Sequence, residues 1–333
     1  MILEHLGEVR SLALVGIGKN VGKTTALNVV VAESSQKKLG LTSIGRDGEL
    51  VDAITAHTKP PIRVPAGTLV ATVEGAMPGL AEAWEIVERT DELTPLGPIV
   101  IGRALREVQW EISGPSTVSG LERVRTSFQA HGADFVIIDG AFDRRSSAAP
   151  LLSDVTLLVS GASVDPDIEK VVGLTAHMVD LLTLPAAELP GEALELLRER
   201  QVGYLAEEVV KLPMRSALGR DRELAAAVPD DARAVLIGTA LTPQLLEALE
   251  RKAALVVVRD PTHALVDPAP LQRFRARGGR LQVGFPVTLP LVIANPFSPY
   301  GWRFDPARFL DRLSAVVAPR PVVDLVLGET VRC

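Results

Sequence analysis

The sequence contains almost no cysteine: among 333 residues there is one, Cys333. A single thiol can form neither a disulfide within the chain nor the thiolate set of a cysteine zinc centre. It also argues against a fused cysteine-dependent glutaminase. The five histidines show no spacing typical of metal ligands. We therefore expect a reduced environment and no zinc centre of this kind.

Basic clusters and long apolar runs are also missing. The formal net charge is −6, and no group of lysines and arginines has the size or pattern of a nucleic-acid-binding patch. No uninterrupted apolar run approaches the roughly 20 residues of a membrane-spanning helix. The start, Met1–His5, carries an acid early and does not read as a signal peptide. We expect a cytoplasmic protein that binds neither nucleic acid nor a membrane.

What the sequence does contain is a phosphate-binding motif. Residues 16–25 read G-I-G-K-N-V-G-K-T-T, after the apolar run Leu12–Val15 and before the helix-compatible run Ala26–Ala32. Strand, glycine loop and helix in this order are typical of a P-loop, the Walker A motif. Its backbone N–H groups and the start of its helix favour an anion. The predicted nucleotide-binding residues are Gly18, Lys19, Asn20, Val21, Gly22, Lys23, Thr24 and Thr25.

Hydrolysis also needs a bound metal ion and a group that senses the γ phosphate. Lys23 is predicted to reach the β and γ phosphates, and the Thr24 hydroxyl to bind Mg²⁺. Asp139 ends the apolar run 135–138, which would bring its carboxylate to the sheet edge beside the loop. Asp47, in the segment that follows the second predicted strand, is the first candidate for the switch, with Glu49 second. The predicted catalytic residues are Lys23, Asp47 and Asp139, and the predicted Mg²⁺ ligands are Thr24, Asp47 and Asp139.

Several other residues have weaker functional interpretations. Arg144 and Arg145 follow Asp139 and could clamp an anion or a neighbouring subunit's nucleotide, although exposed loop arginines commonly do neither. An Asn-Lys-x-Asp guanine-reading signature is absent, which favours ATP. The run 292–295, which ends at Asn295, resembles the strand-then-Asn element that reads adenine in dethiobiotin synthetase, but it comes late in the chain and the Asn-Pro dipeptide is also a common turn starter.

The chain as a whole predicts an α/β fold in two domains. The first, 1–185, is the P-loop domain with a parallel sheet covered on both faces, and the second, 186–333, is a smaller α/β accessory domain. The boundary is placed where the pattern breaks around 183–190. We expect strands at 11–15, 41–44, 69–73, 98–102, 135–138, 154–159, 234–238, 255–259, 281–284, 291–294 and 322–327, and helices at 24–38, 80–89, 121–131, 243–252, 269–277 and 306–317.

The loop spacing resembles one group of P-loop ATPases. The usual motif has a glycine where this chain has Ile17, and here Gly16 is separated by five residues from the Gly-Lys-Thr at 22–24. This longer spacing is similar to dethiobiotin synthetase and the cobyric acid synthase group, within the dimerising class that includes MinD and nitrogenase iron protein. Lys59, before two prolines, is similar to the Lys-Pro of dethiobiotin synthetase. The resemblance implies ATP, Mg²⁺ and a homodimer or another protein partner.

A second resemblance covers nearly the whole chain. The segments I-G-R-D-G-E at 44–49, I-D-G-A at 138–141, S-G-A-S at 160–163 and N-P-F-S-P at 295–299 are similar to a small family that accompanies adenosylcobalamin-dependent lysine aminomutase. That family is assigned as a reactivase subunit, so the resemblance implies an ATPase that serves as an accessory or reactivating factor for a partner enzyme. The alternative is a dethiobiotin-synthetase-like ligase, in which ATP activates a small carboxylate.

Overall fold

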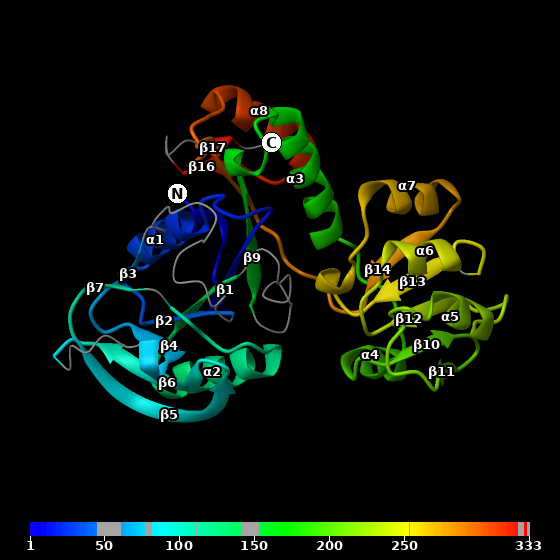
Figure 1. Ribbon diagram of the computed structural model, residues 1–333, viewed down its shortest axis with the longest axis horizontal. Helices are drawn as coiled ribbons and strands as arrows, with labels where there is room; N and C mark the ends of the chain where they lie inside the picture. The colour runs from blue at the N-terminus through cyan, green and yellow to red at the C-terminus, as the bar shows by residue number, and fades with distance from the viewer. Residues whose placement is uncertain are drawn as a thin grey trace. The chain divides into compact units, whose positions relative to one another are not determined.

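The computed structural model describes residues 1–44, 61–76, 82–110, 112–140, 153–252, 254–325 and 330–331. The chain divides into two compact units (Figure 1): Met1–Val179 with Thr288–Cys333, and Asp180–Val287. Each unit is α/β, with helices packed on a sheet. No helix in the described part of the chain is long and apolar enough to cross a membrane.

The first unit contains a large, mostly parallel mixed sheet. Within the described residues its strand order is β17-β16-β15-β9-β1-β8-β2-β4-β6-β5, and Figure 1 shows β16 and β17 at one edge and β5 at the other. Pairing is parallel from β16 to β4 and antiparallel at both edges. The strands are β1 Ser11–Gly16, β2 Leu39–Ser43, β4 Leu69–Val73, β5 Trp84–Thr94, β6 Gly97–Ala104, β8 Phe135–Asp139, β9 Val155–Gly161, β15 Val292–Asn295, β16 Val322–Asp324 and β17 Thr330–Val331.

Both faces of this sheet are buried at its centre. Ala13, Val136 and Ile138 belong to the cluster that packs against α2 (Val118–Ala130). Side chains alternate along a strand, so Leu12 and Ile137 point to the opposite face, and they too are fully buried. The prediction of a covered parallel sheet is therefore confirmed for the central strands. The remaining elements of this unit are α1 Lys23–Glu33, α3 Ile168–Leu182, α8 Pro306–Val317, the 3-10 turns η1 Leu3–His5, η2 Glu74–Ala76 and η4 Ala162–Val164, and the two-stranded ladder of β3 Ile62–Val64 with β7 Val108–Trp110.

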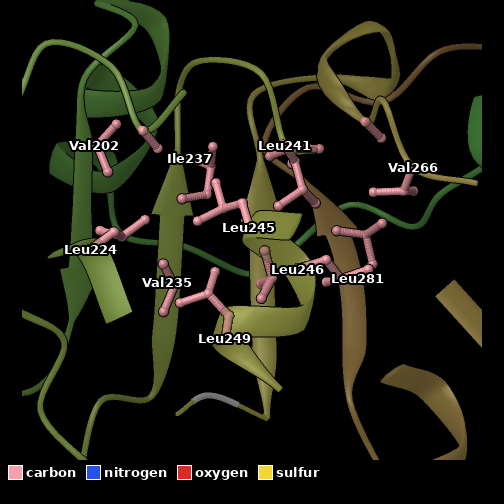
Figure 2. Packing of buried hydrophobic residues seen from close by; sticks show 14 of the residues in the cluster. Val202, Leu224, Val235, Ile237, Leu241, Leu245, Leu246, Leu249, Val266 and Leu281 are labelled. Carbon is pink, nitrogen blue, oxygen red and sulfur yellow. The ribbon is translucent and has the colours of Figure 1, made fainter. Parts of the chain in front are cut away.

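The second unit is built on a smaller sheet with the order β11-β10-β12-β13-β14. Figure 2 shows Leu245, Leu246 and Leu249 of α6 lying against the strand that carries Val235 and Ile237, and all of these side chains are fully buried. This unit therefore has its own apolar core. Its elements are α4 Gly191–Arg198, β10 Val202–Leu205, β11 Val209–Lys211, α5 Asp221–Ala227, β12 Ala234–Ile237, α6 Pro243–Leu249, β13 Leu255–Val258, η5 Pro261–His263, α7 Pro268–Ala276 and β14 Arg280–Val283.

The structure differs from the predicted domain division at its C-terminal part. Residues 186–333 were expected to form the accessory domain, yet β15 pairs in parallel with β9, and β16 pairs with β15. The chain thus leaves the first unit near the end of α3, forms the second unit, and returns at Thr288 to extend the first sheet. Sequence periodicity identified these strands but carried no information on which sheet they join.

Two local predictions are wrong. The helix expected over 80–89 is instead the long strand β5, whose alternate residues face solvent beside β6. The first helix was expected over 24–38, with Gly40 as the residue that terminates it, but α1 ends at Glu33 and Gly40 lies inside β2. A Cβ at Gly40 would lie 2.7 Å from the Phe128 ring of α2. Gly40 is therefore needed for close packing of helix on strand, and it is not a helix terminator.

Candidate functional site

The segment between β1 and α1 forms a tight loop, and two of its residues have a left-handed backbone with positive φ. Gly22 has φ of 100° and caps the start of α1, and Asn20 also has a positive φ, 58°. Lys23 begins the helix, and its side chain turns back over the loop: a Cβ built on Gly16 would lie 3.1 Å from the Lys23 Nζ. The loop therefore brings the lysine ammonium and the start of α1 to one place, which is the arrangement that favours a polyphosphate.

Two side chains from elsewhere in the first unit hold the loop by its carbonyl groups. The Ser163 hydroxyl donates to the Lys19 carbonyl at 2.9 Å, and the Asn295 side-chain amide donates to the Val21 carbonyl at 3.1 Å. In a trans peptide the carbonyl and the following N–H point in opposite directions. Fixing these carbonyls therefore turns the N–H groups of Asn20 and Gly22 away from Ser163 and Asn295.

Glycines at and beside the loop let its backbone approach neighbouring elements closely. A Cβ at Gly161, the last residue of β9, would lie 2.7 Å from the Val21 carbonyl oxygen. Within the loop, a Cβ at Gly18 would lie 2.6 Å from a methyl group of Val164 in η4. A larger residue at either position would have to displace the loop or its neighbour.

Asp139 lies at the carboxyl end of β8, the strand next to β1. Its partners across the two ladders are Leu14 on one side and Ser43 on the other, and the Gly140 N–H donates to the Leu14 carbonyl at 2.9 Å. Neighbouring strands are about 4.8 Å apart. Asp139 therefore lies one strand away from the start of the loop, and Thr24 lies in the first turn of the helix that follows the loop.

Several predicted site residues lie outside the described residues. These are Asp47, Glu49, Lys59, Arg144 and Arg145, so their roles stay predictions. Among the residues that are described, no group of three or more His, Cys, Asp or Glu is placed to hold a metal ion. The remaining candidates for an Mg²⁺ site are Thr24 and Asp139, one hydroxyl and one carboxylate. Such a partial set is typical of Mg²⁺, which takes most of its other ligands from water and phosphate.

The residues that brace the loop were not identified from the sequence. Ser163 and Asn295 lie in segments quoted for the second resemblance, and Asn295 was also considered for adenine or a turn, but neither was predicted to hold the loop backbone. The turn is confirmed, because the Asn295 side-chain oxygen accepts from the Phe297 N–H at 3.2 Å. Its amide is engaged by Val21, as described above. The sequence offered one weak signal for Asn295: it is a polar residue at the end of an apolar run. That this strand joins the same sheet as the loop was not visible in the sequence.

The second unit contains a separate buried polar group at the end of β13. Arg259 and Asp260 are 5% and 1% exposed, with the Arg259 Nε 3.7 Å from an Asp260 oxygen. The other oxygen lies 3.0 Å from His263 Nδ1. Burial raises the pKa of Asp260, but the hydrogen bonds and charges of His263, Thr262 and Arg259 outweigh it and hold that pKa below its usual value. No sequence pattern predicted this network.

Comparison with protein-family models, curated proteins and solved structures gave no significant match. The function of the chain must therefore be inferred from its own residues and from how the structure arranges them.

Proposed function

We propose that the chain binds Mg·ATP at the loop between β1 and α1 and hydrolyses it slowly. The observation that carries this proposal is the Lys23 side chain, folded back over Gly16 at the start of a helix whose cap has a left-handed backbone. A lysine ammonium and a helix N-terminus directed at one point form a binding site for a polyphosphate. This geometry requires the sequence order strand, glycine loop and helix, which the motif supplies.

Each residue of the site has a distinct role in this proposal. Lys23 neutralises charge on the β and γ phosphates, and the loop N–H groups hold the phosphate oxygens. Thr24 and Asp139 bind the Mg²⁺, directly or through water. Once bound, the ion supplies charge neutralisation between phosphates. The residues Gly18 to Val21 form the loop, and Ser163 and Asn295 hold the carbonyls of Lys19 and Val21, so that these oxygens do not face the proposed phosphates.

We further propose that ATP turnover drives a change in protein association, as expected of an accessory or reactivating factor. The support is the resemblance of the sequence to dimerising P-loop ATPases and to the family that accompanies an aminomutase. The alternative ligase needs polar side chains to hold a carboxylate substrate. Beyond Arg259, Asp260 and Asn295, the C-terminal half of the sequence offers few such residues. The Asn295 amide is engaged by the Val21 carbonyl and the Asp260 carboxylate by Thr262 and His263, which favours the accessory role.

Sedimentation combined with phosphate release tests this function. The full chain is sedimented with Mg·ATP, with Mg·ADP and without nucleotide, and phosphate release is measured over a range of protein concentration. The proposal predicts tighter association with ATP than with ADP and turnover per chain that rises as association increases. The coupling is reciprocal, so association must raise ATP affinity by the same factor. A monomer in all three states whose turnover rises only with a small carboxylate would instead support the ligase.

A further inference from the structure

The chain that follows β15 forms a small hairpin beside the phosphate loop. Phe297 and Arg303 form an antiparallel bridge, the Ser298 N–H donates to the Trp302 carbonyl at 3.1 Å, and the Phe304 N–H donates to the Pro296 carbonyl at 2.9 Å. We call residues 297–304 the aromatic hairpin.

The base of the aromatic hairpin is anchored in the core. The buried Phe304 ring packs on Phe309 of α8, with ring centroids 5.1 Å apart. The hairpin is therefore a defined element, and the side chains at its tip are held in place by its backbone.

The aromatic hairpin presents aromatic surface to solvent. Tyr300 and Phe297 are 39% and 38% exposed, and the Tyr300 ring stacks on Trp302 with centroids 5.4 Å apart and planes 29° apart. Aromatic side chains account for 4% of the chain, so this concentration is unusual for it. Exposing large aromatic faces forgoes their burial energy, and such faces commonly mark binding sites.

Hydrogen bonds join Tyr300 to the loop and Trp302 to η4, the turn that packs beside the loop. The Asn20 side-chain amide donates to the Tyr300 hydroxyl at 3.0 Å, and the Trp302 indole N–H donates to the Ala162 carbonyl at 2.8 Å. Asn20 is the non-glycine residue of the loop that has a positive φ, and Ala162 begins η4, which carries Ser163. The tyrosine ring is thus at the margin of the proposed phosphate site.

The strand order sets the direction in which a nucleotide would lie. β8, β1, β9 and β15 are consecutive and parallel, so Asp139, the loop and the hairpin all follow strand ends at the same edge of the sheet. Three strand spacings separate β8 from β15, which is about 14 Å. A nucleoside triphosphate is elongated, with its metal-bound phosphates at one end and its base at the other. With the metal at the Asp139 end, the base lies on the hairpin side.

We propose that the aromatic hairpin is the base-binding wall of this site, with the nucleobase against the Tyr300–Trp302 pair. This deepens the proposed function and depends on it, since it assigns the part of the ligand that the loop does not hold. Every base has a π face that can pack on an aromatic ring, and such stacking contributes substantially to binding. Asn20 orients the Tyr300 ring through its hydroxyl, and Trp302 supports that ring by stacking on it.

Titration calorimetry of the full chain with two ligands distinguishes base binding by the aromatic hairpin from phosphate binding by the loop. Mg·ATP contains a base, and inorganic tripolyphosphate with Mg²⁺ contains only the phosphates. Tyr300→Ala should bind Mg·ATP about 5- to 150-fold more weakly than wild type, while its tripolyphosphate affinity stays within about twofold. Tyr300→Phe keeps the ring and should retain most of the ATP affinity. Leu105→Ala, a change at an exposed apolar residue of the same unit, serves as the surface control.

Each outcome of this experiment decides between the two proposals. If Tyr300→Ala lowers the affinity for both ligands equally, or for neither, the hairpin is not a base-binding wall, although the loop proposal stands. Wild type that binds both ligands with the same affinity would exclude the wall in the same way. Wild type that binds neither ligand overturns the proposed function and the wall with it. Tyr300→Leu, which keeps an apolar side chain but removes the π face, is the second variant if Tyr300→Ala fails to fold, and the same selective loss of Mg·ATP affinity is expected of it.

Discussion

The Asn295 side chain joins β15 to the loop between β1 and α1 by donating to the Val21 carbonyl oxygen at 3.1 Å. The two residues are 274 positions apart, and the whole second unit lies between them in the sequence. The Asn295 side chain also packs closely on Gly22: a Cβ built on Gly22 would lie only 2.7 Å from the Asn295 amide nitrogen. A residue of β15 therefore helps to hold the backbone of the loop between β1 and α1. The shape of this loop depends on its own glycines and on this contact.

Removing the Asn295 amide should loosen the loop. Asn295→Ala should lose two hydrogen bonds, the one donated to the Val21 carbonyl and the one accepted from the Phe297 N–H, and each corresponds to about 0.5–1.5 kcal/mol of net stabilisation. We expect Mg·ATP affinity to fall about 2- to 10-fold by calorimetry. Asn28→Ala is the matched control, because the Asn28 amide also donates to a backbone carbonyl, that of Pro61, but away from the loop. Equal ATP affinities in the two variants would show that Asn295 does not shape the site.

Gly161 tests whether close backbone packing fixes the loop. In Gly161→Ala the new methyl group would meet the Val21 carbonyl at 2.7 Å. We expect a loss of about 1–3 kcal/mol in the free energy of unfolding, with weaker ATP binding. Gly173→Ala, in the exposed part of α3 with nothing within 4 Å, should instead stabilise the chain by up to about 1 kcal/mol. Denaturant unfolding compares the two variants, and a neutral Gly161→Ala would contradict the packing argument.

Asp139 is predicted to act on turnover more than on nucleotide affinity. Asp139→Asn removes a negative charge from the end of β8 and should weaken Mg²⁺ binding. Phosphate release should then fall at least about 10-fold, while binding of ATP in the presence of a chelator stays close to wild type. Asp47→Asn tests the sequence prediction for the second acid in the same assays. Unchanged phosphate release in both variants would remove these carboxylates from the site.

The buried carboxylate of Asp260 should make stability depend on pH. Its pKa in the folded chain lies below its ordinary value, so its contribution is complete above about pH 3.9, the unfolded value, and is lost as pH falls through the folded pKa. Asp260→Asn should therefore destabilise the chain by about 1–3 kcal/mol at neutral pH. The difference from wild type should shrink as the pH drops below about 4. Urea unfolding at several pH values measures it, and a pH-independent difference would contradict this account.

Sequence patterns predicted elements well where one local rule dominates. The strand at 135–138 is a continuous apolar run, and the helix at 306–317 begins at a proline with the Asp305 side chain capping it, so both are nearly as expected. The predicted helix over 80–89 was wrong, because the pairing of β5 with β6 overrode local helix propensity.

Long-range contacts explain what the sequence could not predict about the site. The loop and Asp139 could be proposed as site residues from the sequence because motif spacing and strand ends are local features. Ser163, Asn295 and Tyr300 act through contacts with residues at least 144 positions away, and no local pattern reports such a contact. Asn295 and Tyr300 reach the loop because β15 pairs with β9 in the first sheet.

The most direct test of the central claim is a calorimetric titration of Mg·ATP into the wild-type chain and into Lys23→Ala. Lys211→Ala, a lysine substitution on the exposed face of β11 in the second unit, is the matched control. The account predicts that Lys23→Ala binds at least about 10-fold more weakly, since each lost hydrogen bond to a charged group costs about 1.5–3 kcal/mol. Lys211→Ala should match wild type. Equal affinity in wild type and Lys23→Ala, or no ATP binding by wild type, would contradict the claim that this loop is a nucleotide site.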